Sequence, residues 1–315
     1  MQNLLLVGCG DVARRVLPHL LGHYRVFAAL RDPAQFAFWR EHGALPLFAD
    51  LDCAASLRRL AGLAKVVLHF APPPNSSSGD PRTRHLLATL LRGKSLPQRL
   101  IYISTSGVYG ECAGARVDET WPLRPRTPRA RRRVDAERRL RRFGARSRVR
   151  VSILRAPGIY AADRLPLERL QKGAPALRPE DDVFTNHIPA DDLARLVCSA
   201  LRFGRANRCY NASDDSELKM GEYFDLVADR FGLLRAPRIS RSEAEVGLSP
   251  LQLSFMSESR RLDNRRIKAE LRARLRYPQV ADGVEAAWCA SVEIEKKGIH
   301  HQDTKGTKSH QENRF

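Results

Sequence analysis

The first sixteen residues, MQNLLLVGCGDVARRV, constrain the fold of this chain more than any other stretch. Leu4 to Val7 form a continuous apolar run, which is typical of a strand buried on both faces of a parallel sheet. Gly8, Gly10 and Ala13 follow in the G-x-G-x-x-G/A spacing of a dinucleotide-binding turn. A glycine turn with a purely structural role is the alternative. The position of this turn, between an apolar strand and an amphipathic helix, favours a nucleotide site.

The helix after the turn, expected from about Asp11 through Leu21, would direct its unpaired N–H groups and its positive dipole end at the phosphates. The first glycine permits the tight turn, the second lets the backbone approach a pyrophosphate, and the small alanine lets the helix pack close to the strand. We therefore expect every residue of the turn to contact the nucleotide: Gly8, Cys9, Gly10, Asp11, Val12 and Ala13.

The residue after the second strand bears on the choice of cofactor. Arg25 to Leu30 predicts that strand, about twenty residues after the turn. An acidic residue at its end would bind the ribose hydroxyls of NAD, whereas an arginine accommodates the 2′-phosphate of NADP. The strand leads into Arg31, with Asp32 following, so the sequence favours NADP and leaves NAD as the alternative.

Three further buried strands alternate with helical segments. They are expected at Leu45 to Phe48, Val66 to Phe70 and Leu100 to Ile103, with a helix from Pro81 to Leu91. This alternation predicts an α/β fold with a doubly wound, Rossmann-like parallel sheet.

Ligands of such sheets bind at the carboxyl ends of the strands, which places two further segments near the nucleotide. Asp50 and Leu51 could meet an adenine ring, although Asp50 or Asp52 could equally cap a helix. Ala71 and Pro72 begin the loop that follows the strand Val66 to Phe70.

The strand Leu100 to Ile103 leads into STSGVYG, Ser104 to Gly110. Together with the glycine turn and the later ILRAPGIY, this motif resembles the extended short-chain dehydrogenase/reductase family, in its NAD-dependent epimerase/dehydratase branch. The resemblance runs from Met1 to about Ala287. It implies an NAD(P)-dependent oxidoreductase or epimerase that acts on a small carbonyl or hydroxyl compound, with a small C-terminal α/β substrate lobe.

The resemblance also implies roles for individual residues. In the family, a Ser or Thr four residues before the VYG tyrosine hydrogen-bonds the reacting oxygen, and here that residue is Thr105. A hydroxyl that only caps the strand end is the alternative. Ser104 at the same strand end, and Pro157 and Ile159 in the loop beside the nicotinamide, are the remaining cofactor contacts that we expect.

The family's Tyr-x-x-x-Lys dyad is replaced in this chain. The matching segment is TPRARRRVDAE, in which Pro128 and Glu137 anchor the alignment. The tyrosine position is then Arg129 and the lysine position is Arg133. A guanidinium has a pKa above about 12 and cannot act as a general acid or base at neutral pH. Arg133 could still hydrogen-bond the ribose or a phosphate, and Tyr109 is the nearest phenol on the strand end, although the family does not use it as the proton donor.

Two functions from different classes therefore stay open. One is an oxidoreductase or epimerase that uses altered residues. The other is a cofactor-binding sensor or scaffold without turnover. The replaced tyrosine favours the sensor, and the retained STSGVYG favours the enzyme.

The division of the chain follows from the same resemblance. We expect a nucleotide domain over residues 1–175, to which residues 184–209 return, and a substrate lobe over residues 176–290. Residues 292–315 are polar and are predicted to be a disordered tail, with weak metal binding through His300, His301 and His310 as the less favoured alternative.

The net charge of +19 raises the question of a nucleic-acid partner, because much of it lies between Arg124 and Arg150. No nucleic-acid-binding motif accompanies this run and aromatic residues are sparse around it, so a solvated helix face is favoured over specific nucleic-acid binding. The six cysteines form no CxxC pair, which argues against a metal site. With no signal peptide and no membrane span, the sequence predicts a cytoplasmic protein with a small-molecule substrate.

Overall fold

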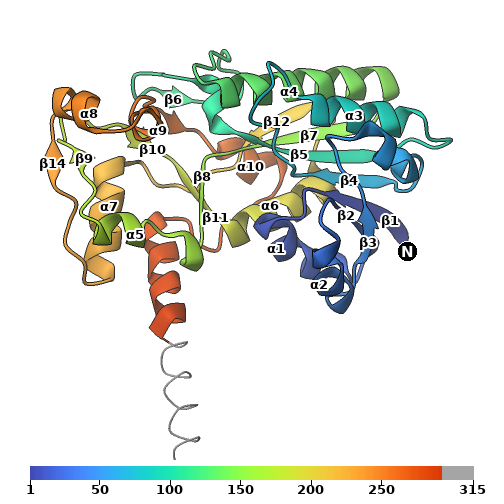
Figure 1. Cartoon of the computed structure of the whole chain (residues 1–315), viewed down its shortest axis with the longest axis horizontal. Coiled ribbons are helices and arrows are strands. Elements are labelled where there is room, and N and C mark those ends of the chain that lie inside the picture. Colours follow the sequence, from blue (N-terminus) through green and yellow to red (C-terminus); the bar gives the residue numbers. More distant parts are fainter. Residues whose placement is uncertain (293–315) are drawn as a thin grey trace, which may run out of the picture.

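A computed structural model describes residues 1–292, and its centre is a seven-stranded sheet in which all strands are parallel (Figure 1). The strand order is β12-β7-β5-β4-β1-β2-β3. The expected doubly wound, Rossmann-like fold is confirmed. The strands are β1 (Gln2–Val7), β2 (Tyr24–Leu30), β3 (Leu45–Phe48), β4 (Val66–His69), β5 (Arg99–Thr105), β7 (Arg150–Ala156) and β12 (Arg208–Asn211).

Helices cover both faces of the sheet, and β1 shows how the sequence divides between them. Leu4 and Leu6 pack into the core under one helical layer, whereas Leu5 and Val7 pack under the other. This alternation is the period of two that a strand imposes on its side chains. The first layer contains α1 (Asp11–Leu20), α2 (Phe36–Glu41), α6 (Ala190–Phe203) and α10 (Arg265–Glu270), and the second contains the 3₁₀ helix η2 (Ala54–Leu60), α3 (Pro81–Leu91) and α4 (Pro128–Ser147).

The two α-helices of the second layer, α3 and α4, each begin with a proline that directly follows a capping residue. The Asp80 carboxylate accepts a hydrogen bond from the Thr83 backbone N–H at 3.1 Å, and Pro81 opens α3. The Thr127 hydroxyl accepts one from the Ala130 N–H at 3.1 Å, and Pro128 opens α4. A cap of this kind typically stabilises a helix by about 1 kcal/mol, and it fixes where α4 starts relative to the end of β5.

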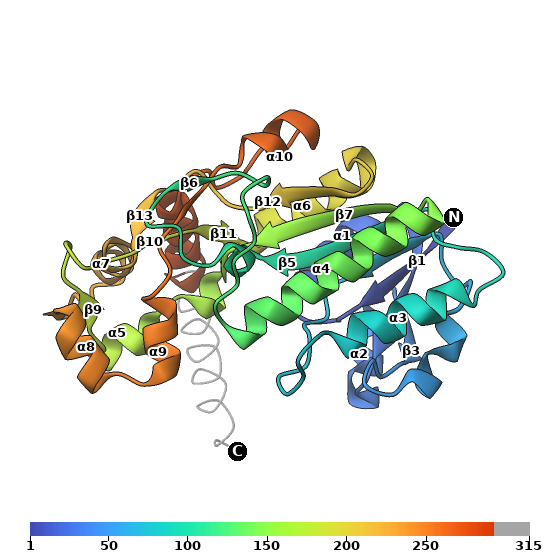
Figure 2. The ribbon, with the colours of Figure 1, turned by 90° about the horizontal axis from the view of Figure 1, so that it is seen from above.

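The C-terminal elements gather at the carboxyl-end side of the sheet (Figure 2). Their core is formed by apolar residues of α5, α7 and the last described helix, which covers residues 280–292. Short strand pairs connect them to the loops that leave the sheet. The elements are β6 (Arg116–Val117) paired with β15 (Arg261–Leu262), β8 (Gly158–Tyr160) with β11 (His187–Pro189), β9 (Ala176–Leu177) with β14 (Arg238–Ile239), β10 (Phe184–Thr185) with β13 (Leu218–Lys219), the 3₁₀ helix η4 (Ala162–Arg164), α5 (Leu167–Gln171), α7 (Met220–Arg230), α8 (Arg241–Gly247) and α9 (Pro250–Phe255). Two further 3₁₀ helices, η1 (Pro33–Gln35) and η3 (Ser106–Tyr109), follow β2 and β5 of the central sheet.

The chain returns to its first sheet late. β12 pairs with β7, and α10 packs against β12 with Ile267 and Leu271 fully buried in the main core. α10 thus belongs to the sheet's helical layer, although it lies within residues 176–290, which the sequence assigns to the substrate lobe.

Within residues 1–292, no helix is both long and apolar enough to cross a membrane. The expected tail, with His300, His301 and His310, lies outside the described residues except for Val292.

Candidate nucleotide groove and active site

Gly8 is the point where the glycine turn touches the loop after β4. Its φ is +90°, and a Cβ built on it would lie 2.2 Å from the Ala71 backbone nitrogen. The Phe70 and Ala71 N–H groups donate to the Val7 carbonyl at 2.7 and 3.2 Å. A side chain at this position would be strained and would displace backbone, so glycine is required here.

Gly10 differs from Gly8 because nothing lies within 4 Å of a Cβ built on it. It precedes α1, whose N-terminus is capped by no side chain in the described part of the chain. Ala13 is 1% exposed and packs into the main core, as expected for the close approach of helix and strand. Free N–H groups beside open space fit a bound pyrophosphate.

The charged residue of the turn is neutralised by basic neighbours. Asp11 accepts from Arg15 Nε at 2.9 Å and pairs with Arg164 of η4, while Arg15 pairs with Asp191 of α6 at 2.8 Å. These pairs tie α1 to two later segments. They also offset the negative charge of Asp11 beside the place where phosphates would bind.

Cys9 takes part in the turn through its backbone. Its Sγ lies 3.3 Å from the Ala29 carbonyl of β2, and burial raises the pKa of the thiol. Val12 is half-buried against the main core. The side chains of both residues therefore face the sheet.

At the end of β2, Arg31 is exposed and makes no hydrogen bond or ion pair with any residue of the described chain. The Asp32 carboxylate is already used within the protein, because it accepts a hydrogen bond from the Ala34 N–H at 3.0 Å and caps η1. The pKa of Asp52 is lowered by a hydrogen bond from Arg82 and, to a smaller extent, by the nearby charge of Arg31. Among the described residues, Arg31 is thus a cation without a hydrogen-bond or ion-pair partner at the end of β2.

The loops after β3 and β4 meet beside Arg82. Asp50 accepts from the Asp52 N–H at 3.0 Å, so its carboxylate forms a local turn instead of capping a helix. Leu51 is nearly buried. Arg82 binds Asp52 through two bonds of 2.7 and 2.6 Å and donates to the Pro72 carbonyl at 3.0 Å. Arg82 therefore connects the two loops that we expect around the adenosine half of the cofactor.

Thr105 ends β5, and its hydroxyl accepts from the Gly107 N–H at 3.2 Å. The capping role considered from the sequence is therefore present. A Cβ built on Gly107 would lie 3.6 Å from Thr105 Oγ1 and 3.9 Å from Ala130 Cβ. The end of β5 and the first turn of α4 are thus neighbours, which brings Thr105 near the arginines of that helix.

Arg133 Nη1 donates to the Tyr102 hydroxyl and to the Ile103 carbonyl, both at 2.8 Å. Its side chain therefore reaches the end of β5. Arg129 lies one helical turn earlier and is exposed. Desolvation and the nearby charge on Arg133 lower the pKa of Arg129. The structure thus brings Arg133 to the strand end that carries Thr105, and Arg129 is close enough to Arg133 to feel its charge.

Two of the expected site residues face the interior. The Ser104 hydroxyl donates to Glu137 Oε1 at 2.7 Å and is buried. The Tyr109 hydroxyl donates to Asn211 Oδ1 at 2.6 Å, accepts from Arg155 Nη1 at 2.8 Å and is fully buried. Burial raises the pKa of Tyr109. Both hydroxyls are hydrogen-bonded within the protein, so neither is free for a ligand in this arrangement, and the expected roles of Ser104 in cofactor binding and of Tyr109 in catalysis stay predictions.

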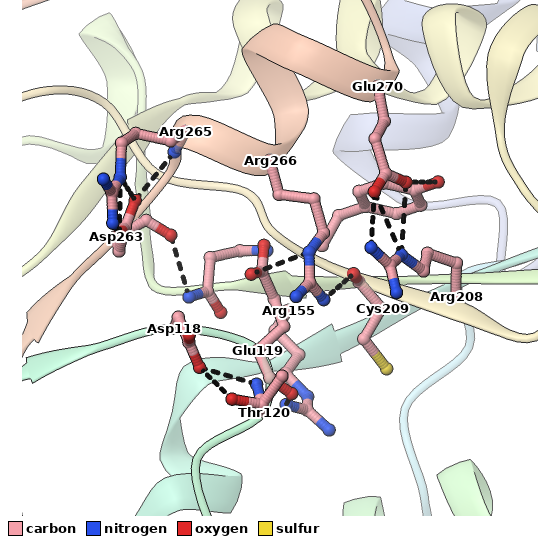
Figure 3. A network of polar contacts seen from close by, with 12 residues as sticks. Asp118, Glu119, Thr120, Arg155, Arg208, Cys209, Asp263, Arg265, Arg266 and Glu270 are labelled. Atoms are coloured by element: carbon pink, nitrogen blue, oxygen red, sulfur yellow. Dashed lines mark hydrogen bonds and ion pairs between the residues drawn. The ribbon is translucent and has the colours of Figure 1, made fainter.

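Their partners form a buried ionic network at the base of the site. Glu137 of α4 accepts from Arg155 Nε and Nη2 at 3.1 and 2.8 Å. The network continues through Glu119, which pairs with Arg266 of α10 at 3.2 Å (Figure 3). It fixes α4, β7 and α10 to the strand end that carries Thr105.

A second buried network was missed by the sequence analysis. His69 Nε2 of β4 is hydrogen-bonded to Thr83 Oγ1 at 2.8 Å, and the Thr83 hydroxyl donates to Asp80 Oδ2 at 2.5 Å. Burial and the nearby charge of Arg133 lower the pKa of His69 to about 3, so the ring is neutral. The ring also lies 5.0 Å from that of Tyr102. The polar residue within the apolar run VVLHF was the only sequence signal for this network.

Pro157 and Ile159 lie at the carboxyl end of β7 and are half-buried. The Gly158 N–H between them donates to the Asn186 carbonyl at 3.1 Å, and β8 pairs with β11. His187 of β11 is 6% exposed and lies 4.2 Å from the Tyr223 ring, and burial lowers its pKa to about 4. His187 is therefore a packed, neutral residue of this region.

A cavity of about 600 Å³ lies elsewhere, between the loop after β6, the loop after β12 and the start of α10. None of the expected site residues lines it. Two ion pairs lie in its lining, Asp263 with Arg265 at 2.5 Å and Arg116 with Glu217 at 2.8 Å, and Asp118 accepts a hydrogen bond from the Thr120 hydroxyl at 2.6 Å (Figure 3). Within residues 1–292, no group of three or more His, Cys, Asp or Glu side chains could hold a metal ion. We therefore place the candidate site at the glycine turn and the end of β5.

Comparisons with known proteins show the family and the fold of the chain. A family model described as NAD(P)H-binding matches residues 8–203, which is more than half of the chain. The chain belongs to this NAD(P)H-binding family. The match begins at Gly8, the first glycine of the turn.

Solved structures extend the likeness over nearly the whole chain. A functionally unknown conserved protein from Silicibacter pomeroyi is 29% identical, with a TM-score of 0.77 over 92% of this chain and 99% of that one. UDP-glucose 4-epimerase from Thermotoga maritima is 18% identical, with a TM-score of 0.73 over 94% and 99%. A dTDP-glucose 4,6-dehydratase from Streptomyces venezuelae, solved with NAD bound, is 20% identical, with a TM-score of 0.72 over 91% and 96%. The resemblance to the epimerase/dehydratase branch of the short-chain dehydrogenase/reductases is confirmed at the level of the fold. No curated protein matches the sequence significantly.

Proposed function

We propose that this NAD(P)H-binding protein prefers NADP(H) and acts slowly as an oxidoreductase on a small carbonyl or hydroxyl compound. The observation that carries the cofactor preference is Arg31, which is exposed at the end of β2 and free of partners among the described residues. The neighbouring Asp32, which would favour NAD, is committed to capping η1. An unpaired guanidinium suits a 2′-phosphate.

The remaining contacts follow from the groove. The uncapped start of α1 and the open space beside Gly10 would receive the pyrophosphate. Ala71 and Pro72 would flank the cofactor from the loop after β4, and Asp50 and Leu51 would flank the adenine. When bound, NADP(H) supplies or accepts a hydride.

The protein's own groups account for the low rate that we expect. The Thr105 hydroxyl would donate a hydrogen bond to the reacting oxygen, and the charges of Arg129 and Arg133 would stabilise negative charge there. Neither guanidinium can exchange a proton at neutral pH. Losing a positioned general acid or base typically reduces the rate by about 10²- to 10⁴-fold.

A non-catalytic NADP sensor is the second candidate, and the placement of two phenols favours it. Tyr109 is locked between Arg155 and Asn211, and Tyr102 is fully buried beneath Arg133. Burial raises the pKa of Tyr102 to about 12. Neither hydroxyl can replace the missing tyrosine of the dyad without a rearrangement.

The cofactor preference is tested by thermal shift and fluorescence titration with NADPH and NADH. A ligand at 100 times its Kd stabilises the native state by about 2.7 kcal/mol, which a thermal shift detects. We expect Arg31→Gln to weaken NADPH about tenfold to a hundredfold and to leave NADH unchanged. Arg25→Gln, at the other end of β2, is the matched control. Equal affinities for both cofactors in the native protein would remove the role of Arg31, and no binding of either would remove the site.

Turnover is tested by NADPH oxidation across a panel of carbonyl compounds. We expect slow activity that falls further in Thr105→Ala and rises in the double variant Arg129→Tyr with Arg133→Lys. Tyr109→Phe reports on the buried network and should leave the rate unchanged if the protein stays folded. Native activity that is fast and insensitive to Thr105→Ala would place the active site elsewhere. No activity in any variant, with NADPH binding intact, would favour the sensor.

A further inference from the structure

Arg129 and Arg133 form a pair of like charges on the first two turns of α4. They are four residues apart, a spacing at which like charges on a helix repel. Arg133 donates from one nitrogen, Nη1, to two neutral oxygens, those of Tyr102 and Ile103. Arg129 makes no hydrogen bond or ion pair with any residue of the described chain. Within the described part of the chain, the pair therefore has unused N–H donors and no ion-pair partner.

The nearby carboxylates are engaged elsewhere. On α4 itself, Asp135 binds Arg139 and the Asp80 N–H, both at 2.8 Å, and Glu137 binds Arg155. Asp80 is close enough to feel the charge of Arg133, but its oxygens accept from the N–H and the hydroxyl of Thr83. None of these acids makes an ion pair with Arg129 or Arg133. No carboxylate of the described residues compensates the pair, so the free donors of both guanidiniums are available to water or to an anionic ligand.

The geometry puts this charge at the reacting end of the site. Arg133 contacts the carbonyl of Ile103, two residues before Thr105. Thr105 itself lies beside the first turn of α4, as the positions around Gly107 show. A group held by the two guanidiniums would therefore lie next to an oxygen bound by the Thr105 hydroxyl.

We propose that Arg129 and Arg133 bind an anionic group of the substrate, a carboxylate or a phosphate, adjacent to its reacting carbon. This proposal rests on the proposed function for the position of the reacting carbon. The planar guanidinium fork matches both anions and forms paired, charge-assisted hydrogen bonds with them. The substitution of arginine at the dyad positions thus selects substrates by charge.

The test measures anion binding directly by isothermal titration calorimetry. Malonate and inorganic phosphate are the anionic probes, and glycerol is the neutral one. Each is titrated into the full chain saturated with NADPH, where the cofactor's own phosphate sites are filled, and into the cofactor-free chain. The variants are Arg129→Gln, Arg133→Lys, which keeps the charge but loses the fork, and Arg131→Gln, an exposed arginine of the same helix, as the matched control.

We expect one anion to bind the NADPH-loaded protein, glycerol not to bind, and Arg129→Gln to weaken the anion about tenfold to a hundredfold. Arg133→Lys should weaken it less, and Arg131→Gln should leave it unchanged. The stronger of malonate and phosphate identifies the group.

The proposal is overturned if NADPH binds and neither anion does, or if Arg129→Gln and Arg131→Gln have equal effects. If NADPH fails to bind, the proposed function fails, and the cofactor-free titration decides this proposal separately. Anion binding there that is lost in Arg129→Gln supports the anion site, and its absence overturns it.

Discussion

Two regions of helix α4 treat the charge of an arginine differently. In the middle of the helix, Glu137 forms an ion pair with a buried arginine, whereas Arg129 and Arg133 near its start form no ion pair with any described residue. Glu137 meets Arg155 from β7 in a bidentate pair whose side chains are 1% and 2% exposed, with Ser104 and Tyr109 completing the hydrogen bonds. One turn earlier Arg133 meets only neutral groups, and one turn before that Arg129 meets none among the described residues.

The difference separates charges that hold the fold from charges that are available to a ligand. A buried ion cannot remain unpaired without a large desolvation cost, so Arg155 is matched on every side. An exposed ion at the carboxyl end of the strands stays hydrated and needs no charged partner. In a chain of net charge +19, the position of an arginine on α4 is therefore more informative than the number of arginines.

The largest expected effect comes from breaking the paired end. Glu137→Gln leaves the Arg155 guanidinium buried without its counter-charge, so we expect the free energy of unfolding in urea to fall by about 3–5 kcal/mol. Replacing Glu137 and Arg155 together by leucine and methionine should recover much of the loss. Glu168→Gln, which removes an exposed pair with Lys172, is the control and should change nothing measurable. If Glu137→Gln lowers the free energy of unfolding by less than about 1 kcal/mol, the buried pair stabilises the protein no more than an exposed pair does, and the contrast with Arg129 and Arg133 is lost.

A buried group with no charged partner sharpens the comparison, because it stays neutral. Burial lowers the pKa of His187 to about 4, whereas an unfolded histidine titrates near 6.5. Between these values the unfolded state binds more protons, so this residue makes the protein less stable as the pH falls. Its contribution is about 1.4 kcal/mol per pH unit.

Urea unfolding between pH 7 and 4 checks this expectation. His187→Phe should lose less stability on acidification than the native protein, and His19→Gln, an exposed control, should follow the native curve. Burial raises the pKa of Asp214 to about 8, which opposes the histidine slope in both proteins, so the difference between them isolates His187. If the unfolding free energies of His187→Phe and the native protein fall equally with pH, burial does not lower the pKa of His187.

The smallest effect is expected at the unpaired end. Arg129→Gln removes a repulsion between like charges four residues apart, so we expect a gain of about 0.2–0.5 kcal/mol in unfolding free energy. Repeated urea titrations at low salt would resolve it, with Arg131→Gln as the reference. A loss above about 1 kcal/mol would reveal a stabilising partner of Arg129 and remove the contrast with Arg155.

The fold was predictable because its signals are local. The bounds expected for β3 and α3, Leu45 to Phe48 and Pro81 to Leu91, agree with the structure, since an apolar run and a capped proline mark them. The turn at Gly8 and Gly10 was predictable for the same reason. Thr105 and Arg133 are candidate site residues because of a motif that spans a few dozen residues, and their roles stay predictions.

The side-chain partners were not predictable, because they join residues far apart in sequence. Tyr109 binds Asn211, 102 positions away, and Ser104 binds Glu137, 33 positions away. Only the packing of α4 against β5, and the pairing of β7 with both β5 and β12, decides that these hydroxyls point inward. The same holds for Tyr102, whose contact with Arg133 depends on where α4 crosses the strand.

The late return of the chain to its first sheet has a consequence during synthesis on the ribosome. β7 is the outer strand of the sheet until β12 pairs with it, and that face of the core stays open until Ile267 and Leu271 of the α10 region cover it. A nascent chain that ends before these residues presents an unpaired strand edge and an apolar surface. The glycine turn, although made first, therefore lies in a complete core only when nearly the whole described chain has been translated.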